Sequence, residues 1–331
     1  MSLTNKTTRR AFCKAFSAST LAAVAAPHFA QAQGAYPTKP IRFILPFGPG
    51  GVADTTSRLV AEKLGDKLGQ RLVVENMPGA GGISAARAAL QAGNDGYALA
   101  LVTNGNAISV PLFKSLPYDP VKDFVPVSSI GTFECLLIVN ASSPYKTLED
   151  WIKVAKEKPG KLNIGTITAG STQHLTAELF KSSAGVDFVI VPSRTTGEAV
   201  VALLRNDIDM VIDFYAALKP GLLDNKTRAL AWSGLTPSPA MPEVPAAINT
   251  VPGFEVVSWN ALYAPAGTPQ NVIDTLNKGL REVLVDPDLK RRALDLGIDL
   301  KASTPADIHD RLQSDIKKWA AVIQRAGIER Q

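Results

Sequence analysis

An apolar segment that runs into a glycine-rich turn and then into a helix occurs twice in this chain. The first covers residues 41–54 and leads into a helix expected to begin near Thr55. The second covers residues 164–175, more than a hundred residues later, and also leads into a helix. The first amides of a helix have no partner within the helix and lie at the positive end of its dipole, so they bind anions. Two such helix starts predict one anionic ligand held from two sides.

Strand-like and helix-like segments alternate along the chain, which predicts an α/β fold with a largely parallel sheet. Strands are expected over residues 41–45, 72–74, 97–102, 133–139, 162–167, 187–191, 209–214, 228–233 and 255–263. Helices are expected over residues 55–68, 83–92, 148–157, 172–183, 197–205, 269–284, 287–296 and 305–326.

Two of the expected strands, 133–139 and 255–263, are long and bracket a middle block that has its own alternation of strands and helices. If both strands cross between lobes, residues 33–134 and 256–331 build one lobe and residues 135–255 the other. Each lobe then contributes one glycine-rich helix start to the cleft, and clefts between lobes are common small-molecule sites.

Residues 1–32 have the composition of an export signal. Lys6, Arg9, Arg10 and Lys14 precede an alanine-rich run without acidic residues, in a twin-arginine pattern, and residues 30–32 form a small-x-small cleavage site. We therefore predict export to the periplasm with cleavage near Ala32. The full chain has a net charge of +5, and removal of these four basic residues leaves +1. This nearly neutral balance argues against nucleic acid as a partner.

The chain has too few histidine and cysteine residues in suitable positions to predict an enzyme active site or a metal centre. Once the export signal is removed, two histidines, His174 and His309, and one cysteine, Cys135, remain. They form no cluster with metal-ligand spacing, and Ser171 lacks a nucleophile-elbow pattern. We predict a non-catalytic protein with no catalytic residue, metal or cofactor.

The first glycine-rich turn leaves one enzymatic alternative open. Residues 48–53 satisfy G-x-G-x-x-A after a strand, and Glu75 falls about where a ribose-binding acid would lie. The alternative is a periplasmic NAD(P)-dependent oxidoreductase that uses this turn. Against it, Pro46 and Phe47 interrupt the junction of strand and glycine, Asp54 places negative charge at the helix start, and no Tyr-x-x-x-Lys pair follows.

Six motifs occur in order along nearly the whole chain after the export signal. They are residues 36–42, 46–51 with Asp54 and Arg58, 74–82, 116–124, 171–175 and 264–269. These motifs resemble those of Bug-family solute receptors, the substrate-binding proteins of tripartite tricarboxylate transporters. The resemblance implies a two-lobed periplasmic-binding-protein (Venus flytrap) fold with a small carboxylate in the cleft. It also implies a monomeric receptor that serves two integral membrane transporter subunits or a sensor.

By the same resemblance, the ligand-binding loops fall on residues 47–54 and 168–174. A ligand carboxylate is expected to accept hydrogen bonds from amides of both loops, with ordered water between some of the groups. The first loop contributes Gly50, Gly51 and Val52, with Phe47 as an apolar wall. The second contributes Ala169, Gly170, Ser171 and Thr172.

Two residues of these loops have alternative roles. Asp54 is favoured as the N-cap of the helix at Thr55 over a direct ligand contact. His174 either donates to the ligand or caps the interface between the lobes, and its ring is expected to be neutral in both cases.

The chain departs from the family pattern at the expected edge of the cleft. Asn106 stands where the family usually presents a histidine, so an amide is expected to replace the imidazole. Arg194 either pairs with a second ligand carboxylate or remains solvated. Asp213 and Tyr215 follow at the end of another strand, and Tyr215 is a candidate for stacking on an aromatic acid.

Overall fold

The structure, a computed structural model, describes residues Tyr36–Gln331, and these form one compact unit. The export signal and cleavage site predicted over residues 1–32 lie outside the described residues. Every helix within Tyr36–Gln331 falls short of the length or the apolar character that crossing a bilayer requires.

The strands form one continuous sheet in the order β2-β1-β3-β9-β4-β7-β5-β6, and β8 and β10 also pair with β4. The strands are β1 (Ile41–Leu45), β2 (Leu72–Asn76), β3 (Ala98–Thr103), β4 (Phe124–Asn140), β5 (Asn163–Ile167), β6 (Val189–Ser193), β7 (Met210–Phe214), β8 (Thr227–Trp232), β9 (Val257–Pro265) and β10 (Asp299–Leu300). The helices are α1 (Val52–Leu68), α2 (Ile83–Gln91), α3 (Asn104–Leu112), α4 (Leu148–Glu157), α5 (Thr172–Ala184), α6 (Thr196–Leu204), α7 (Tyr215–Leu223), α8 (Gln270–Val283), α9 (Pro287–Leu294) and α10 (Pro305–Arg325).

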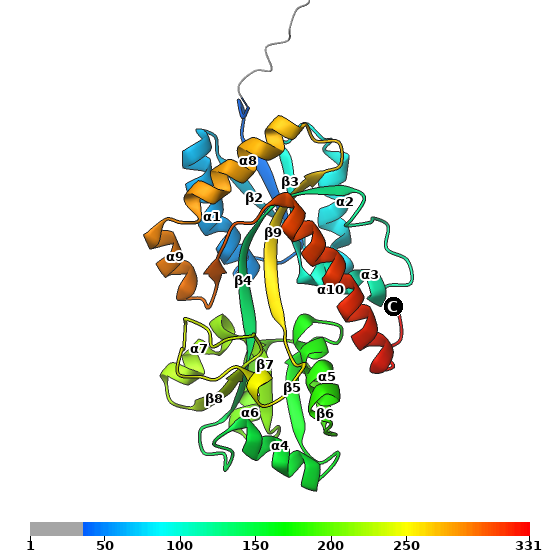
Figure 1. Cartoon of the computed structure of the whole chain (residues 1–331), viewed down its shortest axis with the longest axis vertical. Coiled ribbons are helices and arrows are strands. Elements are labelled where there is room, and N and C mark those ends of the chain that lie inside the picture. The colour runs from blue at the N-terminus through cyan, green and yellow to red at the C-terminus, as the bar shows by residue number, and fades with distance from the viewer. Residues whose placement is uncertain (1–35) are drawn as a thin grey trace, which may run out of the picture. The chain divides into compact units, whose positions relative to one another are not determined.

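Two groups of parallel strands are joined by two long antiparallel ones. Strands β1, β2 and β3 are parallel to one another in the first lobe, and β5, β6 and β7 in the second. Strands β4 and β9 run between the lobes (Figure 1). The expected largely parallel sheet is therefore correct for these two groups of strands and wrong for the rest of the described sheet, where β9 pairs antiparallel with β3 and β4, and β4 pairs antiparallel with β7, β8 and β10.

Strand β4 changes its partners partway along its length. Its first part, from Phe124 to Glu134, pairs with β9. From Cys135 onward it pairs with β7, and from Leu136 with β8. Strand β4 thus takes part in strand pairing in both lobes. Because it connects them, the carboxyl ends of the two groups of parallel strands lie opposite each other.

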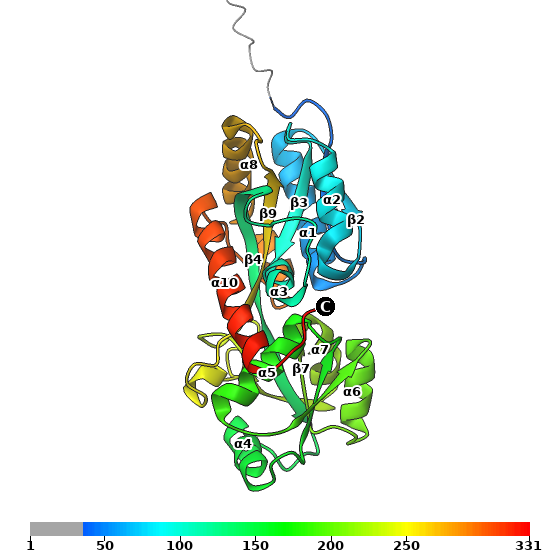
Figure 2. The same ribbon diagram turned by 90° about the vertical axis from the view of Figure 1, so that its right-hand side faces the viewer.

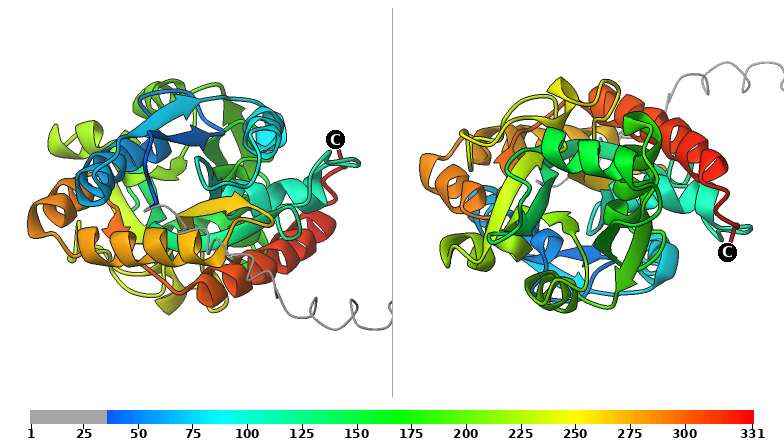
Figure 3. Two further views of the ribbon diagram at one scale, coloured as in Figure 1. Left: turned by 90° about the horizontal axis from the view of Figure 1, so that it is seen from above. Right: turned by 90° about the horizontal axis from the view of Figure 1, so that it is seen from below.

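Apolar helix faces cover the sheet in both lobes. In α1, Val60 and Leu64 are buried and Leu68 is partly buried, as expected from their spacing of four residues. Helix α8 packs on α1, and α8 and α10 lie along the same side of the strands when the molecule is viewed end-on (Figure 3). The four tryptophans, Trp151, Trp232, Trp259 and Trp319, are all fully buried.

Helix α10 lies beside both lobes (Figure 2). Trp319 on this helix donates from Nε1 to Asn104 Oδ1 at the start of α3, at 2.7 Å. Near its C-terminal end, Arg325 donates to Ser182 Oγ on α5 at 3.0 Å. The C-terminal helix therefore bridges an element of the first lobe and an element of the second.

Candidate functional site

A cavity of about 370 Å³ lies where β4 and β9 run between the lobes. Its walls include residues in the first turns of five helices, each of which follows the carboxyl end of a parallel strand. These residues are Val52 and Ala53 (α1), Gly105 (α3), Thr172 and Gln173 (α5), Thr196 (α6) and Ala217 (α7). Phe133 of β4 and Ser258 and Asn260 of β9 also line it. The cavity therefore collects helix N-termini from both lobes.

Amides at the starts of α1 and α5 are unpaired and available to a ligand. Gly51, the N-cap residue of α1, provides no side-chain cap. Ser171 caps α5 through a bond from the amide of His174 to its Oγ, at 3.1 Å. The amides of Val52, Ala53, Thr172 and Gln173 have no acceptor among residues Tyr36–Gln331. Four donors at two dipole ends form a site that suits an anion.

Asp54 holds the first glycine-rich loop in place. Helix α1 begins at Val52, three residues earlier than expected, so Asp54 is the third residue of the helix and the N-cap prediction is wrong. The residue is 3% exposed, and its side chain accepts hydrogen bonds from Gly50 N, Arg58 Nε and Asn76 Nδ2 at 2.9, 3.0 and 2.8 Å. Burial opposes ionisation, but these bonds outweigh it and lower the pKa of Asp54.

The substitution Asp54→Asn should therefore destabilise the protein. A neutral amide cannot accept from all three donors, and loss of hydrogen bonds to a charged group typically costs about 2 kcal/mol. Urea unfolding of the free protein measures this loss. Asp66→Asn, an exposed position in the same helix, is the matched control and should change stability by less than ~0.5 kcal/mol. Equal stabilities of the two variants would show that Asp54 does not secure the loop.

Main-chain dipoles are the source of positive potential at the cavity, because none of its described lining residues is lysine or arginine. Its one ionisable lining side chain is Asp213, which is 2% exposed. Asp213 accepts from Gln173 Nε2 and from the amide of Phe214, both at 2.7 Å, and from Thr196 Oγ1. Burial raises the pKa of Asp213, and these hydrogen bonds oppose the rise.

Aromatic and aliphatic side chains form much of the remaining wall. The rings of Phe133 and Phe214 meet edge to face with their centroids 4.8 Å apart. Phe47 reaches the cavity from the first loop and is 39% exposed, and Ile108 and Ile167 line it from α3 and β5. The cavity can therefore take a ligand with an apolar body.

Seven of the residues predicted from the sequence lie together around the cavity. They are Phe47, Gly51, Val52, Gly170, Ser171, Thr172 and Asp213. Gly50 and Ala169 belong to the same loops but do not line the cavity. Gly50 has a positive φ of 86° and directs its amide to Asp54, which is a supporting role.

Asn106 and His174 are committed to contacts within the protein. Asn106 accepts from the amide of Thr103 and donates to the hydroxyl of Tyr118, both at 2.9 Å, so its amide caps α3 and does not replace a ligand-binding imidazole. His174 Nδ1 accepts from the amide of Gly170 at 3.3 Å, which fixes the second loop. Burial lowers the pKa of His174, which agrees with the expected neutral ring.

Arg194 and Tyr215 do not reach the cavity. Arg194 is exposed and is not among the residues that line the cavity. Tyr215 begins α7 and packs against Trp232, with ring centroids 5.7 Å apart. Its neighbour Phe214 lines the cavity instead, so the aromatic contact predicted at this strand end is displaced by one residue.

Several lining residues were not identified from the sequence. They are Thr103, Phe133, Thr196, Phe214, Ser258 and Asn260. The two-residue alternation of side chains along β9 predicts that Ser258 and Asn260 lie on the same face of the strand. The sequence does not show which face of β9 is turned toward the cavity, so this pattern alone could not identify the two residues.

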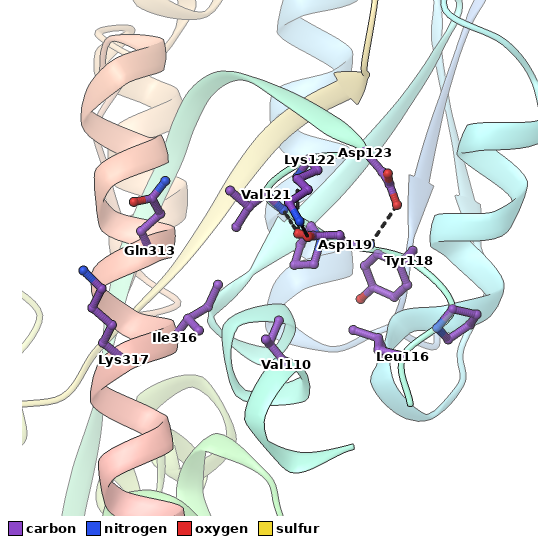
Figure 4. A pocket seen from close by; sticks show the side chains of 12 residues that line it. Val110, Leu116, Tyr118, Asp119, Val121, Lys122, Asp123, Gln313, Ile316 and Lys317 are labelled. Carbon is purple, nitrogen blue, oxygen red and sulfur yellow. Dashed lines mark hydrogen bonds and ion pairs between the residues drawn. The ribbon is translucent and has the colours of Figure 1, made fainter. Parts of the chain in front are cut away.

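A second depression, of about 730 Å³, lies on the first lobe between the loop 116–123 and α10 (Figure 4). Its acidic groups are used within the loop, because Asp123 Oδ2 accepts from the amide of Asp119 and Asp119 Oδ1 accepts from the amide of Val121. The residues that line this depression include none from the first turn of a helix in the second lobe. We therefore place the candidate site in the cavity between the lobes.

Two lobes joined by crossing strands, with a cavity at the junction, define a solute-binding protein of the periplasmic-binding-protein class. The family model described as "Tripartite tricarboxylate transporter family receptor" matches residues 56–328, and the chain belongs to this family. Protein BugT of Bordetella pertussis is 32% identical over 309 residues, which cover 92% of this chain and 94% of BugT.

Solved structures show the same fold. Rpa4515 of R. palustris, determined with adipate, is 31% identical with a TM-score of 0.78, over 88% of this chain and 98% of that one. MatC of Rhodopseudomonas palustris, determined with bound malate, is 31% identical with a TM-score of 0.73, over 87% of this chain and 100% of that one.

These comparisons confirm the predicted family, the two-lobed fold and the assignment as a binding protein rather than an enzyme. The site geometry also gives the oxidoreductase alternative no support. Glu75, its candidate ribose-binding acid, is paired with Arg42 through two hydrogen bonds of 2.7 and 2.8 Å. The carboxylate is thus occupied within the sheet.

Proposed function

We propose that this protein is a periplasmic receptor that captures a small organic carboxylate between its lobes and delivers it to a membrane transporter. The observation that carries this proposal is the set of unpaired amides from α1 and α5 at one cavity. In this proposal, residues 1–32 are removed near Ala32, the receptor is a monomer, and two integral membrane subunits receive the ligand. The lobes comprise residues 33–134 with 256–331, and residues 135–255.

The carboxylate would accept hydrogen bonds from Val52 and Ala53 on one side and from Thr172 and Gln173 on the other. Ordered water can complete the set, since a bridging water is nearly as favourable as a direct bond. Gly51 leaves room for the ligand to approach the main chain closely. Asn104 Nδ2 donates to Thr172 Oγ1 at 3.1 Å, which links the start of α3 to the second loop across the cavity. This bond would help to hold the lobes together over the ligand.

Thermal unfolding with a panel of acids tests the function. The panel includes adipate and malate, which are present in the related structures, together with monocarboxylic, hydroxy, amino and aromatic acids. A ligand at a hundredfold its dissociation constant should add about 2.7 kcal/mol to the free energy of unfolding. The uncharged methyl esters or amides of the same acids are matched controls and should have little effect. Stabilisation by NAD(P) alone, without a response to any acid, would overturn the receptor function in favour of the oxidoreductase.

A further inference from the structure

Asn260 is a buried side chain whose hydrogen-bonding groups are unused. It lies on β9 between Thr103 of β3 and Gly131 of β4, and it is 1% exposed. Neither its Nδ2 nor its Oδ1 has a partner among residues Tyr36–Gln331. Leaving buried polar groups unpaired costs about 1–3 kcal/mol each, so such groups call for a specific explanation.

The position of Asn260 supplies that explanation. Asn260 is among the residues that line the cavity, together with Ser258, which is two residues away on the same face of β9. An amide side chain offers both a donor and an acceptor. A ligand group that also donates and accepts, such as a hydroxyl or a carboxamide, would satisfy both ends of Asn260.

A second carboxylate on the ligand would find no counterion here. The described lining residues include no lysine or arginine, and the ionisable one is Asp213. Asp213 also places its own carboxylate at two further helix starts, because it accepts from the hydroxyl of Thr196, the first residue of α6, and from the amide of Phe214, the N-cap residue of α7. Apart from the one carboxylate that the amides of α1 and α5 would bind, the cavity therefore favours a neutral polar group over a second negative charge.

From these observations we propose that the ligand is a monocarboxylate with an apolar body and a neutral hydroxyl or carboxamide group, and that Asn260 selects this group. The apolar body would contact Phe133 and Phe214, whose rings form an aromatic wall. This inference rests on the proposed function and specifies its substrate class. Asn260 acts as a specificity-determining residue on the β9 wall of the cavity.

Two series of probes test this proposal by calorimetric titration. In each series the carboxylate and the skeleton stay constant while the far substituent is hydrogen, hydroxyl, carboxamide or carboxylate. One series is built on benzoate with the substituent in the para position, and the other on butanoate with the substituent at C4, so that its dicarboxylate member is glutarate. In at least one series, the hydroxyl or carboxamide member should bind at least tenfold more tightly than the unsubstituted and dicarboxylate members. A site built to pair with a polar group rejects analogues that lack it.

The variant Asn260→Leu identifies the residue responsible. Leucine has a similar shape, and an apolar replacement for an unpaired buried amide should leave the unfolding temperature of the free protein unchanged or raised. The preference for the polar member should fall at least tenfold, while binding of the unsubstituted member is retained. Thr268→Val, which changes a buried hydroxyl that is bonded to Pro265 O, is a control away from the cavity and should keep the preference.

The outcomes separate this inference from the proposed function. If a dicarboxylate binds most tightly, or if Asn260→Leu leaves the order of affinities unchanged, the receptor function stands and the inference is wrong. A marked fall in the unfolding temperature of free Asn260→Leu would also overturn it, because the amide would then have a structural role. If no carboxylate in the probe series or the wider panel binds, the proposed function fails, and the inference fails with it.

Discussion

The substitution Gly51→Val should weaken carboxylate binding at least 100-fold and leave the unfolding temperature of the free protein unchanged. Gly51 has φ −78° and ψ 172°, an extended conformation that any residue adopts. A Cβ built on it meets no atom within 4 Å, so the fold can accommodate a larger side chain. Because Gly51 lines the cavity, the added methyl groups would occupy space next to the amides that bind the ligand. A 100-fold loss corresponds to about 2.7 kcal/mol.

Gly48→Val is the matched control for this experiment. Gly48 lies in the same loop, has open space around its Cβ position and does not line the cavity. Calorimetric titration of both variants with the tightest acid of the panel, together with thermal unfolding without ligand, separates binding from folding. Gly50 is unsuitable for either role, because its positive φ would strain any replacement. If Gly51→Val binds as tightly as Gly48→Val, the first loop lies outside the site.

The substitution Glu134→Gln should remove a large pH dependence of stability. Glu134 lies where β4 changes its partners, and its carboxyl group lies close to Gly234. Burial raises its pKa from 4.5 to about 7, and the negative charges of Asp299 and Glu255 contribute to the rise. Between these two pKa values the folded protein holds a proton that the unfolded chain has released.

The sign of the effect follows from this difference in bound protons. The contribution of Glu134 to stability is fully present below pH ~4.5 and is lost as the pH rises through about 7, for a total of about 3 kcal/mol. Urea unfolding at a series of pH values measures it as the widening difference between the wild type and Glu134→Gln. Glu157→Gln, an exposed position on α4, serves as the control and should follow the wild-type curve. Parallel curves for wild type and Glu134→Gln would show that Glu134 titrates normally.

Local sequence patterns predicted the regular elements well. The bounds of β1 and α4 agree with the structure at both ends, since a clear apolar period and, for α4, the capping residue Thr147 mark them. Helices α3 and α7 were missed because each begins directly at a strand end and contains a proline, Pro111 or Pro220. The first part of β4 was missed because Pro126 and Gly131 interrupt its pattern, and irregular pairing with β9 accommodates both residues.

The part of the candidate site that local sequence patterns determine was predicted, and the part that depends on tertiary packing was not. Glycine-rich turns before helices are local features, so Gly51, Val52, Ser171 and Thr172 were accessible to sequence reasoning. Which side of a strand end faces the cleft depends on how two distant segments pack. Tyr215 was therefore chosen where Phe214 lines the cavity, and Asn260 was not identified at all.

The contact between Trp319 and Asn104 has a practical consequence. The indole N–H bonds to Asn104, and the amide of Asn104 bonds to Thr172 in the second loop. Any movement of that loop on ligand capture changes the polar environment of this indole, and tryptophan emission responds to such changes. We therefore expect the intrinsic fluorescence of Trp319 to report ligand capture without an attached dye.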